Sequence, residues 1–454
     1  MSSRPLTAAI VGAGPAGVFT ADILRQQVPT AHIDLFERLP VPFGLVRYGV
    51  APDHPRIRAI VDSLRSVLDR GDIRLVADIE IGTDLGVQQL QDAYDVVILA
   101  TGADDDAPFT IPGADLPGSF GASRFVSWYA AHPEAPRHWT LDSERVAVVG
   151  AGNVALDITR MLTKRADDLL DTDIPDHVHD ALRASRITDV HVFARRGPAE
   201  AAFSPLELRE LGEVPDVDIV VDPADMVIER SSELLMTTYK QRRLVVEKLR
   251  EWAQRDPARF TASRRIHLHF MQAPIRFDGV DRVEGITVER TRHLVNGMVE
   301  GTGETRRYRV GQVYRAVGYA STPIDGVPFD RSRRVVPHDK GRVIGPDGAP
   351  IPGLYVSGWI KRGPVGLIGS TKSDSLQTVA SLVEDAGRSR LRGNDTDPLE
   401  RLLDDAGLRP GGWSGWLRVD EQERRLGAER GRERIKIYDR RTLRRLALGE
   451  AVTA

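Results

Sequence analysis

Two stretches of this 454-residue chain decide its fold: AIVGAGPAGVFTADIL (Ala9–Leu24) and AVVGAGNVALDITRML (Ala147–Leu162). They resemble each other position by position. Each has a short apolar run, a glycine turn and an amphipathic helical pattern, which is the opening of a βαβ nucleotide-binding unit. A chain with two such units is predicted to bind two nucleotides.

The first stretch contains a complete G-x-G-x-x-G fingerprint at Gly12, Gly14 and Gly17. The first glycine permits a tight turn, the second lets the backbone approach a pyrophosphate, and the third lets the helix pack against its strand. Glu37 ends the next predicted strand, His32–Phe36. A carboxylate there accepts hydrogen bonds from ribose hydroxyls and disfavours a 2′-phosphate. This site is therefore predicted to take FAD or NAD.

The second stretch has the G-x-G-x-x-A variant at Gly150, Gly152 and Ala155. Its second strand ends in Arg195 and Arg196 instead of an acid. Two guanidinium groups at the adenosine ribose would hold a 2′-phosphate through charge-assisted bonds, which favours NADP(H) over NAD(H). The alternative is a solvated charged turn, because arginines are common in this chain.

The order of these units predicts an α/β protein with two Rossmann-like dinucleotide-binding domains, the NADP domain being inserted into the FAD domain. The FAD domain would comprise residues 1–102 and 320–454, and the NADP domain residues 103–319. Lys164–Arg186 is expected to continue the second helix and to include an insertion. The charged tail, from about residue 390, is expected to be a helical cover.

Composition limits the classes of function. The net charge of −3 gives no reason to expect nucleic acid as a partner. The absence of cysteine removes disulfides, thiolate metal sites and the internal redox dithiol that disulfide reductases use, and no metal site is predicted. The N-terminus lacks the pattern of a signal peptide and no long apolar run is present, so we expect a cytoplasmic protein without a membrane span.

Longer motifs resemble the adrenodoxin reductase-like ferredoxin–NADP⁺ reductases, which are FAD enzymes of mitochondria and bacteria. The motifs are VGAGPAG (Val11–Gly17), PFGLVRYGVAPDHP (Pro42–Pro55), GAGNVALD (Gly150–Asp157), RRGP with AAF and ELREL (Arg195–Leu211), AVGY (Ala316–Tyr319) and GWIKRGPVGLIG (Gly358–Gly369). The second and last of these are much more specific than a glycine fingerprint. One departure concerns Ala107, which stands where the family often has an arginine near NADP.

The resemblance implies roles for matched positions. Contacts to FAD are implied for Ala16, Glu37 and Leu45, and contacts to the flavin end for Trp359, Gly366, Leu367 and Ile368. Contacts to NADP are implied for Asn153, Val154, Arg195, Arg196 and Glu207, and Gly366 is placed near both nucleotides. His54 and Glu210 match a His and a Glu near the flavin and the nicotinamide, and are the catalytic candidates.

The residues alone also predict a property of the flavin end. The loop Gly363–Gly369 precedes a predicted helix, Ser373–Asp385, whose positive N-terminus would stabilise negative charge on a reduced flavin. An ordinary glycine turn is the alternative. His54, in a loop between prolines, is either a structural histidine or a partner for a cofactor oxygen or a proton. Glu210 is by default a solvated charge.

The resemblance implies an NADPH:ferredoxin oxidoreductase, in which hydride passes from NADPH to FAD and single electrons leave to an iron–sulfur carrier. Such carriers are usually acidic, and a basic segment could steer one; its residues are Lys240, Arg242, Arg243, Lys248 and Arg250, with Arg264 and Arg265 later. A solvated helical face explains this segment equally well. The alternatives for the whole chain are an NADPH-dependent flavin monooxygenase and a non-catalytic flavin redox sensor.

Overall fold

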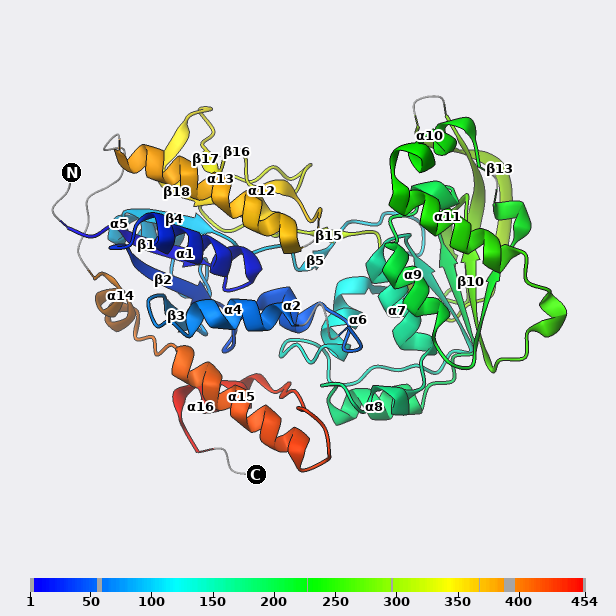
Figure 1. Cartoon of the computed structure of the whole chain (residues 1–454), viewed down its shortest axis with the longest axis horizontal. Helices are drawn as coiled ribbons and strands as arrows, with labels where there is room; N and C mark the ends of the chain where they lie inside the picture. The colour runs from blue at the N-terminus through cyan, green and yellow to red at the C-terminus, as the bar shows by residue number, and fades with distance from the viewer. Residues whose placement is uncertain are drawn as a thin grey trace. The chain divides into compact units, whose positions relative to one another are not determined.

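The structure is a computed structural model that describes residues 4–54, 59–226, 228–294, 297–366, 368–387 and 397–451. The chain divides into two compact units, whose elements are labelled in Figure 1. The first comprises Met1–Asp105, Ala130–Glu134 and Tyr319–Ala454, and the second comprises Asp106–Tyr129 and Ala135–Gly318. The second unit is thus inserted into the first in sequence, and the short segment 130–134 groups with the first unit.

The described residues of the first unit form a seven-stranded sheet in the order β16-β17-β18-β4-β1-β2-β3. Its strands are β1 (Thr7–Val11), β2 (His32–Glu37), β3 (Arg74–Ala77), β4 (Val96–Leu99), β16 (His338–Asp339), β17 (Arg342–Ile344) and β18 (Pro350–Val356). From β3 to β18 the neighbours are parallel, whereas β17 and β16 add antiparallel pairs at the edge. Every residue of β1 is buried, as expected for a parallel strand that is covered on both faces.

Helices cover both faces of this sheet. They are α1 (Pro15–Gln27), α2 (Gly44–Tyr48), α4 (Ile60–Leu68), α5 (Val87–Ala93), α12 (Trp359–Arg362), α13 (Ile368–Gly387), α14 (Leu399–Ala406), α15 (Trp413–Ala428) and α16 (Arg440–Leu448). One apolar core joins the sheet to α1, α4, α13, α15 and α16, and a second joins the other face to α5 and α14. The fingerprint turn after β1 therefore lies between two packed layers.

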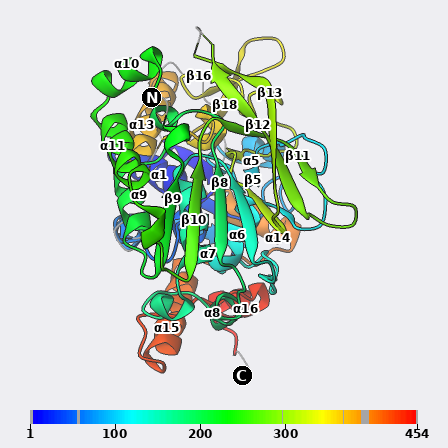
Figure 2. The ribbon, with the colours of Figure 1, turned by 90° about the vertical axis from the view of Figure 1, so that its right-hand side faces the viewer.

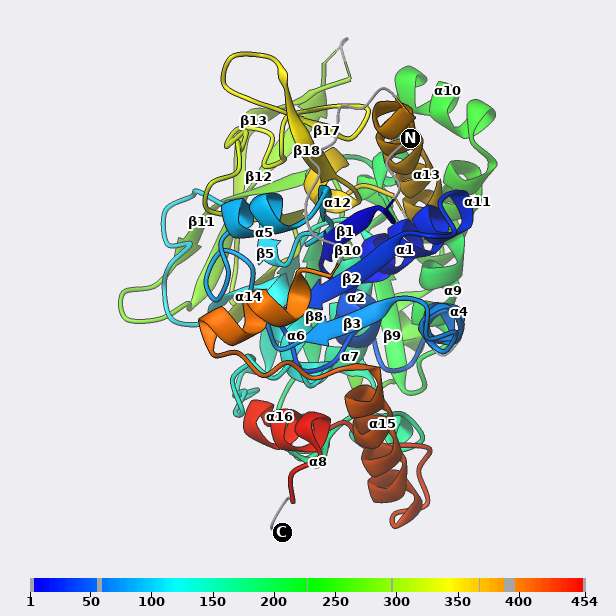
Figure 3. The same ribbon diagram turned by 90° about the vertical axis from the view of Figure 1, so that its left-hand side faces the viewer.

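The C-terminal tail is part of the first unit's core, as the expected helical cover (orange and red in Figure 3). Gly411 forms a backbone bridge with Ala77 at the end of β3, with N···O distances of 2.8 and 2.9 Å in the two directions. Trp416 and Leu443 are buried in the core that also contains β1 and β2. The tail is thus attached directly to the edge of the nucleotide-binding sheet.

The second unit is built on a parallel sheet with the order β6-β14-β7-β8-β10-β9. Its strands are β6 (Ser119–Gly121), β7 (Arg145–Val149), β8 (Asp189–Phe193), β9 (Val217–Val221), β10 (Arg264–His269) and β14 (Gln312–Arg315). Figure 2 shows β9, β10 and β8 side by side. A three-stranded antiparallel sheet packs on one face through a shared apolar core, and consists of β11 (Gln272–Asp278), β12 (Gly285–His293) and β13 (Val299–Tyr308).

The helices of the second unit are α6 (Ala122–Tyr129), α7 (Asn153–Thr163), α8 (Asp176–Arg183), α9 (Pro205–Gly212), α10 (Arg230–Thr238) and α11 (Lys240–Ala253). The prediction that α7 continues past Lys164 is wrong, because Lys164 has extended backbone angles and ends the helix. A separate 3₁₀ turn at Ala166–Leu169 and helix α8 fill the connection. The predicted class is confirmed: an α/β chain with two Rossmann-like units, one inserted in the other.

Candidate functional site

The turn between β1 and α1 has the shape of a diphosphate cradle. Helix α1 begins at Pro15, and its N-cap, Gly14, is extended and provides no side-chain cap. A Cβ on Gly17 would lie 1.8 Å from the carbonyl oxygen of Gly12, so only glycine allows the helix to start this close to the strand. An uncapped helix N-terminus offers backbone N–H groups to an anion. These residues fit a bound dinucleotide.

Glu37, at the end of β2, is held beside this turn. One carboxylate oxygen accepts from Ala13 N at 2.9 Å and the other from Leu39 N at 3.0 Å. Burial raises the pKa of the Glu37 carboxyl, although the two N–H groups act in the opposite direction. Each carboxylate oxygen has a second lone pair for a hydroxyl donor. The arrangement fits a ribose, and the guanidinium of the neighbouring Arg38 is already paired with Asp104 and Glu134.

The loop after β2 packs against the same turn. Phe43 N donates to Ala13 O at 2.9 Å, and Phe43 has a positive φ of 86° that directs the chain into α2. Leu45, in the first turn of α2, is half-buried. His54 is 5% exposed, and its backbone N–H donates to Ala51 O at 3.1 Å. The structure thus places Leu45 on the segment that contacts the fingerprint, whereas the role predicted for His54 stays a prediction.

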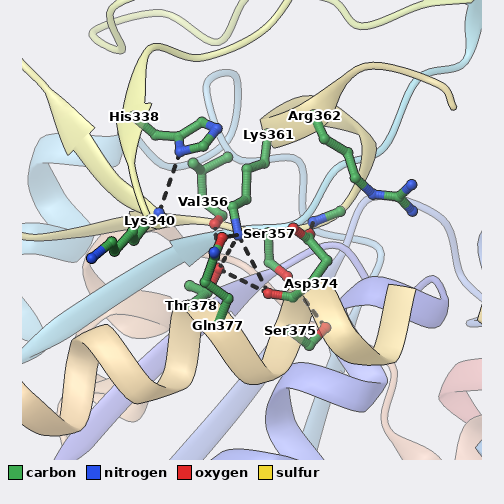
Figure 4. Close-up of polar contacts among 12 residues, drawn as sticks. His338, Lys340, Val356, Ser357, Lys361, Arg362, Asp374, Ser375, Gln377 and Thr378 are labelled. Carbon is green, nitrogen blue, oxygen red and sulfur yellow. Dashed lines mark hydrogen bonds and ion pairs between the residues drawn. The ribbon is translucent and has the colours of Figure 1, made fainter. Parts of the chain in front are cut away.

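A buried ion pair closes the strand–loop–helix segment at the predicted flavin end (Figure 4). Lys361 Nζ lies 2.8 Å from Asp374 Oδ1 and also donates to Gln377 Oε1 at 3.0 Å and to Thr378 Oγ1 at 3.1 Å. The second oxygen of Asp374 accepts from Gly358 N at 2.6 Å. Asp374 therefore joins α13 to both ends of α12 and fixes the frame around the glycine loop.

Among the described residues, the predicted flavin contacts lie on α12, in the glycine loop after it and at the start of α13. Trp359 is half-buried and stacks on Tyr319, with ring centroids 6.2 Å apart. Gly366 is exposed, with a positive φ of 89°. Leu367 lies outside the described residues, and Ile368 is described only as the first residue of α13.

Hydroxyl groups connect the flavin-end helix to α1. Thr20 Oγ1 lies 3.1 Å from Ser357 Oγ and 3.0 Å from Ser375 Oγ, and it donates to Ala16 O at 2.6 Å. A Cβ on Gly358 would lie 2.5 Å from Ala16 Cβ. The structure therefore brings Ala16 of the fingerprint helix together with the start of the GWIKRG segment.

The second fingerprint, between β7 and α7, is similarly uncapped. Its N-cap, Gly152, is extended with no side-chain cap, and a Cβ there would meet no atom within 4 Å. Asn153 Oδ1 accepts from Ser204 N at 2.9 Å, which joins the start of α7 to the start of α9. Asn153 and Val154 are both half-buried. The backbone of this turn is open at Gly152, and the side-chain amide of Asn153 keeps its NH₂ group as a donor.

Glu207 is a buried member of a charged group next to this turn. It is 4% exposed, and Arg160 Nη1 lies 3.5 Å from its carboxylate. Arg160 also donates to Asp157 at 2.8 Å. The Ser204 hydroxyl caps α9 by accepting from Glu207 N at 3.1 Å. Glu210, one turn further along α9, is half-buried.

Arg195 and Arg196 follow β8 directly after Ala194, which the strand register aligns with Glu37 of the first unit. Their carbonyl oxygens are fixed, because they accept from Thr291 Oγ1 at 2.8 Å and from Met271 N at 3.1 Å. Both side chains are exposed. In the part of the chain that the structure describes, neither guanidinium has a hydrogen-bond or ion-pair partner. Two cations are thus available where the first unit presents a carboxylate.

The basic segment is less available than its sequence indicates. Lys248 pairs with Glu251 at 2.8 Å, and the Arg242 guanidinium donates to a backbone carbonyl. Arg264 lies on β10, away from α11 in sequence, and donates to two backbone carbonyls at 2.7 and 2.9 Å. The exposed basic residues of α11 are Lys240, Arg243 and Arg250, of which Arg243 lies 3.7 Å from Glu247.

Sequence reasoning missed two buried ion pairs of the first unit, Lys361–Asp374 and Arg47–Glu423. Lys361 and Arg47 are part of motifs quoted above, but a motif does not indicate which distant residue each one pairs with.

His54 belongs to the first unit and Glu210 to the second. In the described residues, no helix combines the length and apolar character needed to cross a membrane.

Comparisons with known proteins agree over nearly the whole chain. The family described as "Pyridine nucleotide-disulphide oxidoreductase" matches residues 6–358. The mitochondrial NADPH:adrenodoxin oxidoreductase of Arabidopsis thaliana is 36% identical, over 96% of this chain and 94% of that protein. NADPH-ferredoxin reductase FprA of Mycobacterium tuberculosis is 36% identical, over 98% of this chain and 100% of that protein. The solved structure of Mycobacterium tuberculosis FprA in complex with NADPH has a TM-score of 0.92 and 37% identity, and covers 98% of this chain and 100% of that chain.

Proposed function

The chain belongs to the pyridine nucleotide-disulphide oxidoreductase family and groups there with the NADPH-ferredoxin and NADPH-adrenodoxin reductases, and we propose that it is an FAD-dependent NADPH:ferredoxin oxidoreductase. One observation supports this most strongly. The two fingerprint turns are alike, but the residues at the end of the next strand differ in charge: the buried carboxylate of Glu37 ends β2, whereas the exposed guanidiniums of Arg195 and Arg196 come just after β8. Two different dinucleotides are expected from such a pair.

The first unit is assigned to FAD. Glu37 would accept hydrogen bonds from the adenosine ribose, and the first turn of α1, with Ala16, would face the pyrophosphate. Leu45, Trp359, Gly366, Leu367 and Ile368 are assigned to the flavin side of the same unit. Lys361 and Asp374 would hold that loop in one geometry.

The second unit is assigned to NADP(H). Arg195 and Arg196 would bind the 2′-phosphate, and the first turn of α7, with Asn153 and Val154, would face the pyrophosphate. Glu207 is assigned to NADP(H) as well. The resemblance implies an arginine at the position of Ala107, so Arg195 and Arg196 would supply a larger share of the charge that NADPH meets here.

The chemistry that the bound groups supply is hydride transfer from NADPH and the release of single electrons by the flavin. The chain's own task is to position the two nucleotides and exclude water. The N-terminus of α13 would stabilise negative charge at the flavin end, by about 0.3–2 kcal/mol in typical cases. His54 and Glu210 are proposed to be catalytic residues beside the flavin and the nicotinamide.

The electron acceptor is proposed to be an iron–sulfur protein, because the chain has no cysteine to form an internal dithiol. Its docking is proposed to involve the exposed side chains of α11 rather than the whole basic segment, since Arg242 and Lys248 already have partners. A cytoplasmic location stays a prediction, since two of the relatives named as mitochondrial are as similar to this chain as the bacterial ones.

The proposed function is tested by anaerobic mixing of the purified, FAD-loaded protein with NADPH or NADH in a stopped-flow spectrometer. We expect stoichiometric FAD and rapid bleaching of the flavin band by NADPH, with NADH saturating only at far higher concentration. A protein that binds no flavin, or whose flavin NADPH does not reduce, would contradict the proposal.

A further inference from the structure

We propose that the C-terminal tail is a working part of the FAD site, in which Glu423 acts through Arg47 as a positioning residue that sets how tightly FAD is held. This inference rests on the proposed FAD site at the first fingerprint. The tail lies beyond residues 6–358, the span that matches the family, and no role is assigned to it above other than cover. All residues that link Glu423 to the first fingerprint turn belong to the first unit.

Glu423, on α15, is fully buried and makes a polar link between the tail and the rest of the unit. Its carboxylate accepts from Arg47 at 2.5 and 3.1 Å, in a bidentate geometry, and from Ile437 N at 2.9 Å. Arg434 Nη1 adds a longer contact at 3.4 Å. Four donors on one buried carboxylate leave little freedom, so the position of Glu423 fixes the position of the Arg47 guanidinium.

Arg47 is held as tightly as Glu423. It is 5% exposed, and its guanidinium lies over the rings of Trp416 and Tyr48, at 5.1 and 5.0 Å from the ring centroids. Burial would lower the pKa of Arg47, but the charge of Glu423 more than offsets this and raises the pKa above its ordinary value. Arg47 is therefore charged whenever the protein is folded near neutral pH.

A second tail residue holds the same segment by its backbone. Lys436 is 3% exposed, and its ammonium donates to Arg47 O at 2.6 Å and to Ala130 O at 3.1 Å. The tail thus contacts α2 at two points of Arg47, its guanidinium and its backbone carbonyl oxygen.

From α2 the contacts reach the fingerprint turn directly. The ring of Trp416 packs edge-on against Phe43, with centroids 5.3 Å apart, and Phe43 N donates to Ala13 O at 2.9 Å. A Cβ on Gly44 would lie 3.1 Å from the Cα of Gly14, so the two backbones touch. A shift of α2 must therefore move Ala13 or Gly14, which are the residues proposed to face the pyrophosphate.

A neutral residue in place of Glu423 leaves Arg47 as a buried charge without its partner. A buried charge that loses its partner is strongly unfavourable, so Arg47 and α2 are expected to move toward water. Because Ala13 and Gly14 contact α2, FAD is expected to be held less tightly and to leave faster. If the tail had a purely structural role, the substitution would instead lower the free energy of unfolding and leave the affinity of the folded protein for FAD unchanged.

The test compares Glu423→Gln with Asp385→Asn. Asp385 is also a buried carboxylate of the first unit that accepts two bonds from an arginine, Arg342, at 2.7 and 3.1 Å, but it lies near the C-terminal end of α13. Each holoprotein is diluted, and the rise of free FAD fluorescence gives the dissociation rate and Kd. The free energy of unfolding is measured in urea on the same samples, together with the visible circular dichroism of the bound flavin.

We expect Glu423→Gln to raise the Kd for FAD by about tenfold or more, with an altered flavin dichroism band. Asp385→Asn should lose similar stability and change the Kd less than about threefold. Glu423→Asp, which keeps the charge but shortens the side chain, should weaken FAD binding less than Glu423→Gln does. If Glu423→Gln does not fold, Glu423→Asp against Asp385→Glu decides the question, since only the former should weaken FAD binding.

Equal Kd values for the Glu423 variants and their Asp385 counterparts would overturn the positioning role and leave the proposed function intact. A wild-type protein that binds no FAD would overturn the proposed function, and this inference with it.

Discussion

Replacement of Arg195 and Arg196 by alanine is expected to remove the preference for NADPH. Both guanidiniums are exposed and, in the described residues, have no partner that they would leave behind. A hydrogen bond to a charged group contributes about 1.5–3 kcal/mol, and the low end applies at an exposed position. Two such bonds give about 3 kcal/mol, which corresponds to a roughly hundredfold rise in the Kd for NADPH.

NADH lacks the 2′-phosphate, so its Kd should change by less than about threefold in the double variant. The assay is anaerobic flavin reduction, in which the dependence of the rate on nucleotide concentration gives Kd for each donor. Arg183→Ala is the matched control, because Arg183 is an exposed arginine of the same unit on α8. An equal loss for NADPH and NADH, or an equal loss in the control, would remove these arginines from the 2′-phosphate role.

Three further predictions concern other parts of the molecule. Glu37→Ala should weaken FAD binding by roughly tenfold or more while NADPH affinity in the second unit stays the same, as measured by FAD release and by nucleotide titration; an unchanged FAD Kd would contradict the ribose role. Burial, together with the charge of His267, lowers the pKa of His191 to about 3 from its ordinary 6.5. Between these two pH values the unfolded chain binds more protons than the folded protein, so the free energy of unfolding should fall as the pH drops below about 6.5. The loss due to this residue is up to ~1.4 kcal/mol per pH unit. Urea unfolding of the second unit between pH 7 and pH 4 checks this, and His191→Phe, which keeps a stacked ring, should flatten the profile; an equal slope in the variant would refute it. Reduction of an acidic ferredoxin should slow steeply as salt rises, and Lys240→Glu with Arg250→Glu should slow it further at low salt; a flat salt profile would rule out docking by charge on α11.

The sequence predicts the parts of this protein that depend on local pattern. The two glycine turns need specific backbone shapes at fixed spacing, and Glu37 and the Arg195–Arg196 pair follow each second strand at the expected place. The sequence pattern is least reliable for the ends of helices, where the backbone conformation of a single residue can end a helix within a helical pattern. Helix α7 ends at Thr163 although helical periodicity runs on, because Lys164 is extended.

Contacts between distant segments were not predictable from the chain alone. Arg47 and Glu423 are 376 residues apart, and neither the PFGLVRYG motif nor the charged tail names its partner. Lys361 belongs to a recognised motif, yet its ion pair with Asp374 depends on how α12 and α13 pack. Arg242 and Lys248 were expected in a docking surface, and the structure shows partners for both that the sequence does not reveal.

In the proposed function, electrons from NADPH leave this protein singly to an iron–sulfur carrier. The most direct measurement is double-mixing stopped flow without oxygen, in which the NADPH-reduced protein meets an oxidised acidic [2Fe–2S] ferredoxin and both chromophores are followed. We expect ferredoxin reduction within the time of a single turnover, with NADH far less effective as the first donor. A reduced flavin that persists beside oxidised ferredoxin, and is reoxidised only when oxygen and a small organic substrate are added, would contradict it and favour a monooxygenase.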